Sequence, residues 1–465
     1  MKKKQNIVFV VPDGVGIRNY LYSDLITHIK SKANLHFWTT LPQHAVQEVE
    51  KLHSVSIGYS HFTLPKESTF TRLYREAAKF ARLLHNSKLL NNKTILGNWN
   101  KNRGSLKFKT LYFFAERIGK VASKKYKHIL ALESKSLRYW DRKLINHYKD
   151  QLNSLKPSVI FITHQRVAFL NPICIAAKEL NIKVICTIYS WDNTPKASLA
   201  IKADVYLVWS QYMKNELSLL YPEIDSNNII VTGTPQFEFY FDEKRRVSRK
   251  DFAKKYHLNE NKKWICFSGD DIITSPYDPY YLEDVAKAVN AIPLEERPQI
   301  IFRRCPVDVS NRYDSVIEAY SEIITPIAPA WNTQIKSWGA VYPRIEDIDL
   351  LVNIAFHCDL VINVGSTMAH DFAVYNKPCF FINYDQKEDP NWSVKTIYNF
   401  QHFRSMGSLD AVGWFNNKEE IKDTLLLGLQ NPASIAKDKQ VWMKLIVHHP
   451  LEENAKLIAN QLLND

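Results

Sequence analysis

The sequence predicts an α/β protein with two doubly wound, Rossmann-like domains that face each other across a cleft. Three features indicate this fold. Continuous apolar strands alternate with helical segments in two series, a polar stretch at 241–261 separates the series, and residues 66–157 have helical patterns without strand patterns. Strands that are apolar throughout are typical of parallel sheets covered on both faces. The chain of 465 residues is long enough for two or three domains, each with its own core.

The first series predicts a domain over residues 1–240, interrupted by a helical insertion at about 66–157. Its strands are expected at 7–11, 35–38, 55–57, 159–163, 183–188, 205–209 and 228–231. Its helices are expected at 17–32, 172–180 and 211–220, and those of the insertion at 71–85, 106–127 and 134–155. The spacing of the apolar residues within these segments supports these assignments.

The second series predicts a domain over residues 262–435, after a linker at 241–261. Its strands are expected at 264–267, 299–302, 360–363 and 379–382, and its helices at 346–357, 367–375 and 418–428. The tail at 436–465 contains a helical segment, 451–463, without a strand of its own. We expect this tail to pack back toward the first domain.

Composition narrows the class of protein. No apolar run reaches the ~18–20 residues that span a bilayer, and the apolar run at 7–11 is too short for a signal peptide. The six cysteines are scattered, without Cys-x-x-Cys or Cys/His spacing that would hold a metal. These patterns predict a cytoplasmic protein that has reduced thiols and no metal site.

The formal net charge of +13 is unevenly distributed. Residues 66–150 contain 21 Lys or Arg against 6 Asp or Glu, a net charge of +15. Within them, 111–121 mixes aromatic and basic side chains, a composition typical of helices that lie on anionic membranes. A helical subdomain with solvated lysines remains the alternative. No nucleic-acid-binding motif is present, so nucleic acid is not an expected partner.

The loops that follow the strands of the second domain carry the predicted donor-binding residues, because ligands of doubly wound domains bind there. Gly365, Ser366 and Thr367 lie between a strand and a helix start, where backbone N–H groups and hydroxyls favour a phosphate. Asp371 is one helical turn further on, near the place of a ribose. The other candidates are Arg303 and Arg304 for a diphosphate, Gly269 for close approach of a ligand, and Pro343 and Arg344 for a base.

The loops of the first domain carry the candidate catalytic residues. Asp13, His164 and Asp192 follow three strands, and each could take a proton from an attacking hydroxyl. The expected acceptor-side residues are Gly14, Gly16, Arg18, Trp191 and Asn193. Structural roles remain the alternative for each of these residues.

Several of these segments resemble GT-B glycosyltransferases, and most of all the bacterial surface-polysaccharide members related to CDP-glycerol glycerophosphotransferases. The segments are 190–193, 203–210, 231–237, 359–371 and 376–378. The resemblance implies an acceptor domain followed by a nucleotide-donor domain, with the donor diphosphate at Gly365–Thr367. It also implies that no divalent metal or other cofactor is required. Arg303-Arg304-Cys305-Pro306 stands where polyol-phosphate transferases often have Arg-x-His-Pro, which counts against glycerophosphate transfer.

The leading hypothesis is a glycosyltransferase of polysaccharide, glycolipid or cell-envelope synthesis. It would move a sugar from a nucleotide-sugar to a hydroxyl of a glycan or lipid-linked acceptor, as a peripheral protein on the cytoplasmic membrane face. A nucleotide-sugar 2-epimerase and a polyol-phosphate transferase are alternatives of the same fold. A non-catalytic cationic scaffold that binds anionic lipid or nucleic acid is the alternative of another class.

Overall fold

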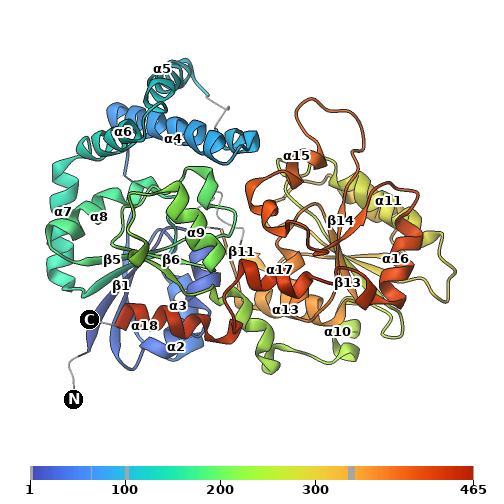
Figure 1. Cartoon of the computed structure of the whole chain (residues 1–465). Helices are drawn as coiled ribbons and strands as arrows, with labels where there is room; N and C mark the ends of the chain where they lie inside the picture. The colour runs from blue at the N-terminus through green and yellow to red at the C-terminus, as the bar shows by residue number, and fades with distance from the viewer. Residues whose placement is uncertain (1–3, 64, 100–103, 333–340, 464–465) are drawn as a thin grey trace.

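The computed structural model describes residues 4–63, 65–99, 104–332 and 341–463. It contains two parallel sheets with helices on both faces, which confirms the predicted fold class (Figure 1). The first sheet has the order β3-β2-β1-β4-β5-β6-β7 and the second β10-β9-β8-β13-β14-β15.

Most strands follow the predicted apolar runs closely, but β10 (Ile324–Ile327) and β15 (Gly413–Phe415) were not among the predicted strands. Those of the first sheet are β1 (Gln5–Val11), β2 (Ala33–Thr39), β3 (Ile57–His61), β4 (Val159–Ile162), β5 (Lys183–Thr187), β6 (Val205–Val208) and β7 (Ile229–Val231). Those of the second are β8 (Trp264–Ser268), β9 (Gln299–Arg303), β10 (Ile324–Ile327), β13 (Leu360–Asn363), β14 (Cys379–Ile382) and β15 (Gly413–Phe415). A short hairpin pairs β11 (Trp331–Asn332) with β12 (Tyr342–Pro343).

The strand orders create one switch point in each sheet. In the first sheet the order reverses between β1 and β4, and in the second between β8 and β13. Both pairs are parallel, so the loops after their carboxyl ends diverge and leave a crevice between them. The loops after these four strands begin with Pro12, Thr163, Gly269 and Val364, and they contain most of the residues that the sequence singles out.

The helical insertion lies between β3 and β4. It consists of α4 (Thr69–Leu89), α5 (Leu106–Ala122), α6 (Tyr126–Arg138) and α7 (Arg142–Leu155), and α4 packs against both α5 and α6 (Figure 1). The predicted helix 106–127 is interrupted at 123–125, between α5 and α6. The predicted helix 134–155 is interrupted at 139–141, between α6 and α7. Arg82 of α4 is fully buried and pairs with Glu133 of α6 and with Glu223, which ties the insertion to the first domain.

The remaining helices cover the two sheets. They are α1 (Gly14–Gly16), α2 (Leu25–Ile29), α3 (Gln43–His53), α8 (Asn171–Glu179), α9 (Gln211–Leu220), α10 (Arg249–Tyr256), α11 (Asp278–Asn290), α12 (Asp314–Ala319), α13 (Ile345–His357), α14 (Met368–Ala373), α15 (Val394–Tyr398), α16 (Ile421–Gln430), α17 (Lys439–Ile446) and α18 (Asn454–Leu463).

Two predictions, one about a helix and one about the linker, differ from the structure in detail. The single helix expected at 17–32 is a π-helical turn, Ile17–Leu21, followed by α2, and the Ser23 hydroxyl donates to the Tyr20 carbonyl at the break. Such side-chain bonds compete with helical ones. The stretch expected as a linker contains α10, whose Phe252 ring packs 6.0 Å from that of Trp264 in β8.

The C-terminal segment crosses between the domains. Helix α17 packs against α14 of the second domain and α9 of the first, and α18 packs against α2 (Figure 1). The Asn454 amide donates to the Thr234 carbonyl at 3.3 Å. In the described part of the chain, no helix is both long and apolar enough to cross a membrane.

Candidate functional site

A cavity of about 270 Å³ lies between the two domains, where the two switch points face each other. The first domain contributes residues from the loops after β1 and β5, and the second contributes residues after β8, β9 and β13. Three arginines line it: Arg18, Arg303 and Arg304. This cavity therefore brings basic side chains of both domains together.

Arg303 is held in position by a buried carboxylate. Its Nη2 donates to both oxygens of Asp347, at 3.0 and 3.1 Å, and both residues are almost fully buried. Asp347 also accepts from the Ala330 N–H and the Trp331 indole, each at 2.8 Å. Burial raises the pKa of Asp347, but Arg303 and Arg18 lower it more, so it stays ionised. Arg303 Nη1 has no hydrogen-bond partner among the described residues.

Arg18 lies on the side of this cavity that the first domain forms. The sequence predicted it on the acceptor side, and the structure places it at the same cavity as the predicted donor-binding residues. Within the described residues, Arg18 makes no ion pair, and its buried Nε has no partner. It is close enough to Asp347 and Asp371 to lower the pKa of both carboxyls. Arg18 and Arg303 thus offer unused donors in one place.

The other carboxyls of this cavity oppose that positive charge weakly. Burial and the neighbouring Asp278 and Asp271 raise the pKa of Asp270 well above its usual range. Burial also raises the pKa of Asp371, against the effect of Arg18, and its carboxyl accepts from the Tyr240 hydroxyl at 2.7 Å. A raised pKa reduces the negative charge that these two carboxyls place beside the arginines.

The turn after β13 supplies hydroxyls to the same cavity. Ser366 and Thr367 line it, and the Thr367 hydroxyl accepts a hydrogen bond from the Trp191 indole at 3.4 Å. Gly365 has φ +73°, which glycine adopts readily. Gly365 lines a neighbouring cavity of about 260 Å³ instead, next to Phe403. The predicted helix start is shifted, because α14 begins at Met368 and Ser366 Oγ accepts from its N–H at 3.3 Å.

The remaining predicted donor residues divide into two groups. Gly269, Arg304 and Pro343 line the cavity between the domains. Arg344 does not: it is exposed, directly before α13, and lines none of the described cavities. Its expected role at a base has no support in this geometry.

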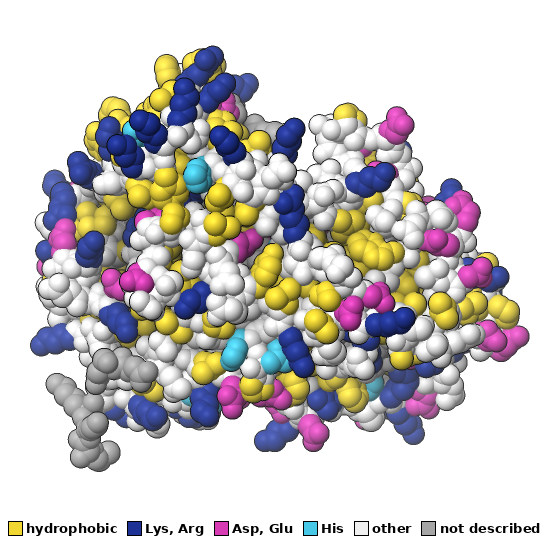
Figure 2. All heavy atoms as spheres, viewed as in Figure 1, with side chains coloured by type: hydrophobic (Ala, Val, Ile, Leu, Met, Phe, Trp, Pro, Cys, Tyr) yellow, Lys and Arg dark blue, Asp and Glu magenta, His cyan; other side chains and the backbone are white. Residues whose placement is uncertain are grey.

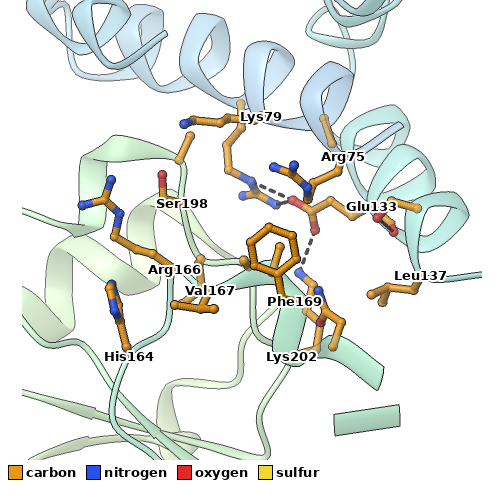
Figure 3. A pocket seen from close by; sticks show the side chains of 18 of the residues that line it. Arg75, Lys79, Glu133, Leu137, His164, Arg166, Val167, Phe169, Ser198 and Lys202 are labelled. Carbon is orange, nitrogen blue, oxygen red and sulfur yellow. Dashed lines mark hydrogen bonds and ion pairs between the residues drawn. The ribbon is translucent and has the colours of Figure 1, made fainter. Parts of the chain in front are cut away.

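A second and larger cavity, of about 720 Å³, lies between the insertion and the first sheet (Figure 3). Asp13, after β1, and His164, after β4, both line it. His164 Nδ1 donates a short hydrogen bond to Asp13 Oδ2, while Asp13 Oδ1 accepts from the Val15 N–H at 3.2 Å. His164 Nε2 has no partner in the described chain. This pair has the form of a general base that a carboxylate orients.

Tyr189 joins the two cavities, because it lines both. Its ring meets that of His164 edge-on, with centroids 4.2 Å apart, and its hydroxyl accepts from Arg166 at 3.3 Å. Tyr189 therefore forms part of the wall of both cavities.

The other candidates from the first domain lie away from this junction. Asp192 is surrounded by donors: Ser190 at 2.6 Å, Asn193 at 2.8 Å and the ion-paired Lys196. Burial raises the pKa of Asp192, but Lys196 and these bonds lower it further, so it is a poor base. It lines only the cavity of Gly365.

Trp191, Asn193, Gly14 and Gly16 have packing roles, which corrects their expected place on the acceptor side. Trp191 is buried against His370, His402 and Trp442, and Asn193 is buried beside Asp192. Gly14 approaches β12 so closely that a Cβ would overlap the Val341 carbonyl. Gly16 lies against Thr163. These contacts hold the two domains together and hold β1 beside β4.

Sequence reasoning did not select several residues that line the cavity between the domains, among them Asn19, Trp209, Gln236 and Trp331. Trp331 lies in a two-residue strand, too short for a periodic signal, and the other three look like ordinary helix, strand-end and loop residues. Among the described residues, no group of three or more His, Cys, Asp or Glu could hold a metal ion.

The fold is similar to solved structures of nucleotide-sugar enzymes. A putative UDP-N-acetylglucosamine 2-epimerase from Listeria monocytogenes aligns with a TM-score of 0.55 at 10% identity, over 100% of this chain and 98% of that one. A glycosyltransferase from Rickettsia africae aligns with a TM-score of 0.53 at 12% identity, over the whole of both chains. The chain has the GT-B fold.

A third structure, MnaA of S. aureus solved with UDP, has a TM-score of 0.52 at 11% identity and covers 98% of this chain and 96% of that one. No protein-family model matches the chain, and no curated protein matches it in sequence. At such low identity, the GT-B similarity extends to the fold, and the activity has to be inferred from the site.

Proposed function

We propose that this protein is a glycosyltransferase that moves a sugar from a nucleoside diphosphate sugar to a hydroxyl of a second substrate. The observation that carries the proposal is the pair of cavities that meet at Tyr189. One has unused guanidinium donors and hydroxyls, and the other has the Asp13–His164 pair. A transferase needs both, because it must bind a leaving group and activate a nucleophile.

The nucleotide-sugar is assigned to the cavity between the domains. Arg18 and Arg303 would pair with the diphosphate, with Ser366 and Thr367 donating to its oxygens. The solved S. aureus structure contains UDP, which supports a nucleotide in a GT-B chain of this kind. Three arginines in this cavity make transfer without a metal or other cofactor the simplest proposal.

The proposed chemical step uses these groups as base and as diphosphate ligands. The acceptor hydroxyl gives its proton to His164 Nε2, and its oxygen attacks the anomeric carbon of the sugar. The bond from that carbon to the diphosphate oxygen breaks, and the nucleoside diphosphate leaves with the bonding electrons. Arg18 and Arg303 stabilise the negative charge that develops on it. Asp13 keeps His164 oriented and stabilises the imidazolium that forms.

The acceptor is proposed to be a glycan or lipid-linked molecule of the cell envelope, reached from the inner membrane face. Helix α5 buries Leu111, Tyr112 and Ala115 on one side. On its other side Leu106, Phe113, Phe114 and Val121 are between 49 and 78% exposed. Figure 2 shows Lys and Arg side chains around hydrophobic ones over the insertion. Apolar and cationic side chains together fit an anionic lipid surface.

A donor screen tests this function. UDP-, GDP-, dTDP- and CDP-linked sugars and CDP-glycerol are added to the protein, and thermal unfolding is followed. At least one donor raises the midpoint in the wild type and does so far less in Arg18→Gln. If no nucleotide changes the midpoint while anionic liposomes still bind, the protein is a cationic scaffold and the transferase proposal is wrong.

A nucleotide-sugar 2-epimerase is the second candidate, because the similar structure from Listeria monocytogenes bears that name. Epimerisation needs no acceptor. Incubation with UDP-N-acetylglucosamine alone, followed by proton NMR, distinguishes the two reactions: an epimerase forms the 2-epimer or releases UDP without any hydroxyl acceptor, and a transferase leaves the donor essentially intact.

A further inference from the structure

The cavity beside His164 contains five basic side chains, and three of them are already neutralised. Arg75 pairs with Glu67 and Glu76, Arg82 pairs with Glu133 and Glu223, and Lys202 pairs with Glu133 at 2.7 Å. These pairs tie α4 to α6 and to the first domain. The positive charges of these three residues are therefore balanced by carboxylates of the protein.

Lys79 and Arg166 are different. Lys79, on α4, is half-buried and has no hydrogen bond or ion pair among the described residues. Burial lowers the pKa of Lys79, and the nearby Arg166, Arg75 and Lys196 lower it further, against the single effect of Glu76. Arg166, which is exposed, donates only to the Tyr189 hydroxyl. Two cations thus share one side of the cavity without an anion between them.

Their position relative to the reacting group is favourable. In Figure 3, Lys79 reaches from α4 toward Arg166, with Ser198 between them, and His164 lies below Arg166 on the same side. The apolar side chains Val167, Phe169 and Leu137 also line the cavity: Val167 lies beside Arg166, and Phe169 and Leu137 lie near the paired Glu133 and Lys202. The two unpaired cations therefore suit an anion, and Phe169 offers an apolar surface to a sugar ring.

We propose that the acceptor carries an anionic group, a phosphate or a carboxylate, which binds between Lys79 and Arg166 while its hydroxyl faces His164. This inference rests on the proposed function and narrows its second substrate to an acidic one. An anion there satisfies two unpaired cations at once, and such charge-assisted bonds are stronger than neutral ones. A neutral acceptor would leave Lys79 half-buried without a partner, which costs free energy.

The test uses the full chain with UDP at saturating concentration, so that the cavity between the domains is filled. Glucose 6-phosphate, glucuronate and methyl α-glucoside are then titrated separately, and binding is measured by ligand-observed NMR. The phosphate and the carboxylate probe distinguish the two kinds of acidic acceptor, and the methyl glucoside is the neutral control. We expect at least one acidic probe to bind and the neutral one to bind at least about tenfold more weakly.

Three variants locate the binding. Lys79→Met and Arg166→Gln each raise the dissociation constant of the acidic probe about tenfold. Lys202→Met removes the same charge from a paired lysine of the same cavity and leaves that constant unchanged. Because Lys79→Met removes an unpaired, half-buried charge, its thermal midpoint should equal or exceed that of the wild type, which separates lost binding from lost folding.

The outcomes separate this inference from the proposed function. If UDP binds but neither acidic probe does, or if probe binding survives in Lys79→Met and Arg166→Gln, the acidic-acceptor inference is wrong and the transferase proposal stands. If UDP itself fails to bind, the proposed function fails first. Binding of an acidic probe that depends on Lys79 and Arg166 supports the inference.

Discussion

His164 and Asp13 are 151 residues apart in sequence, yet His164 Nδ1 donates directly to the Asp13 carboxylate. They meet because they follow β4 and β1, two strands that are neighbours in the first sheet. The bond favours the imidazole tautomer whose Nε2 can accept a proton. That nitrogen is buried and has no hydrogen-bond partner among the described residues.

This pairing predicts a steep loss of turnover in two variants. Asp13→Asn and His164→Ala should each lower kcat by about 10²–10⁴-fold, because a positioned base contributes roughly that much. Affinity for the nucleotide should change little. Release of nucleoside diphosphate with an identified donor and acceptor measures both quantities. Asp192→Asn is the matched comparison, since that carboxylate lies at another cavity, and an equal loss there would contradict the assignment of the base.

Replacing Arg18 tests the diphosphate site. Arg18 makes no ion pair among the described residues, so its replacement leaves no buried carboxylate unpaired. Arg18→Gln should therefore fold normally and weaken nucleoside diphosphate binding by about tenfold or more. Arg303→Gln should also weaken binding, but it leaves Asp347 buried without its cation and should cost about 3–5 kcal/mol of stability. Calorimetric titration with UDP and denaturant unfolding separate the two effects. Unchanged UDP affinity in Arg18→Gln would contradict the site.

A methyl group at Gly14 should disturb the contact between the domains. In Gly14→Ala the new Cβ overlaps the Val341 carbonyl, and backbone cannot move as easily as a side chain. We expect a destabilisation of about 1–3 kcal/mol, as in overpacked cores, and weaker nucleotide binding. Gly97→Ala is the control, because no atom of the described residues lies within 4 Å of the added carbon. Denaturant unfolding of both variants measures the difference.

Acid should destabilise the contact around Trp191. Burial lowers the pKa of His370 to about 3 and that of His402 to about 4. Between these values and 6.5, the unfolded chain binds protons that the folded chain does not, so stability falls as pH drops below about 6.5. Each histidine contributes up to about 1.4 kcal/mol per pH unit in that range.

His370→Phe keeps an aromatic ring at this position but removes the titrating imidazole. The stability of this variant should therefore fall less steeply between pH 6 and 4 than that of the wild type. Urea unfolding at several pH values gives the slopes. Identical slopes in the two proteins would mean that His370 does not titrate in this way.

The exposed face of α5 should control binding to lipid. Wild-type protein should sediment with vesicles of phosphatidylglycerol and less with neutral phosphatidylcholine, and salt should reduce the binding. Changing Phe113 and Phe114 to serine together should weaken it by about tenfold or more, since each loses apolar burial. The exposed Leu427, on α16 of the second domain, is the control position. Equal sedimentation with both kinds of vesicle would leave α5 a solvated helix.

Much of the fold could be predicted from local patterns. The apolar runs of β1 and β13 appear at almost the expected residues, because buried parallel strands need apolar side chains on both faces. Short or amphipathic elements were harder to predict from the sequence. Helix α3 and strands β10 and β15 had no clear pattern, and the π-helical turn at Ile17–Leu21 depends on contacts that sequence does not display.

The residues of the candidate site also include some whose place was predictable from the sequence and some whose place was not. Gly269, Arg303, Arg304, Ser366, Thr367 and Asp371 were predicted near a ligand because they follow strands, and they line one cavity. Arg18 and Trp191 were both expected on the acceptor side, and the sequence did not indicate their contacts. Arg18 extends into the cavity of the other domain's arginines, and the Trp191 indole is covered by residues from α14, α17 and the segment around His402.

The sequence by itself determined which residues form strands and which loops end them, because hydrophobic period and strand length are local properties. Only the tertiary structure decided which loop ends meet. The pairing of β1 with β4, the closure of the two domains around Arg18 and Arg303, and the insertion that sets Lys79 opposite Arg166 all depend on long-range packing. The free energy of that packing comes from surfaces far apart in the chain, which no short window of sequence records.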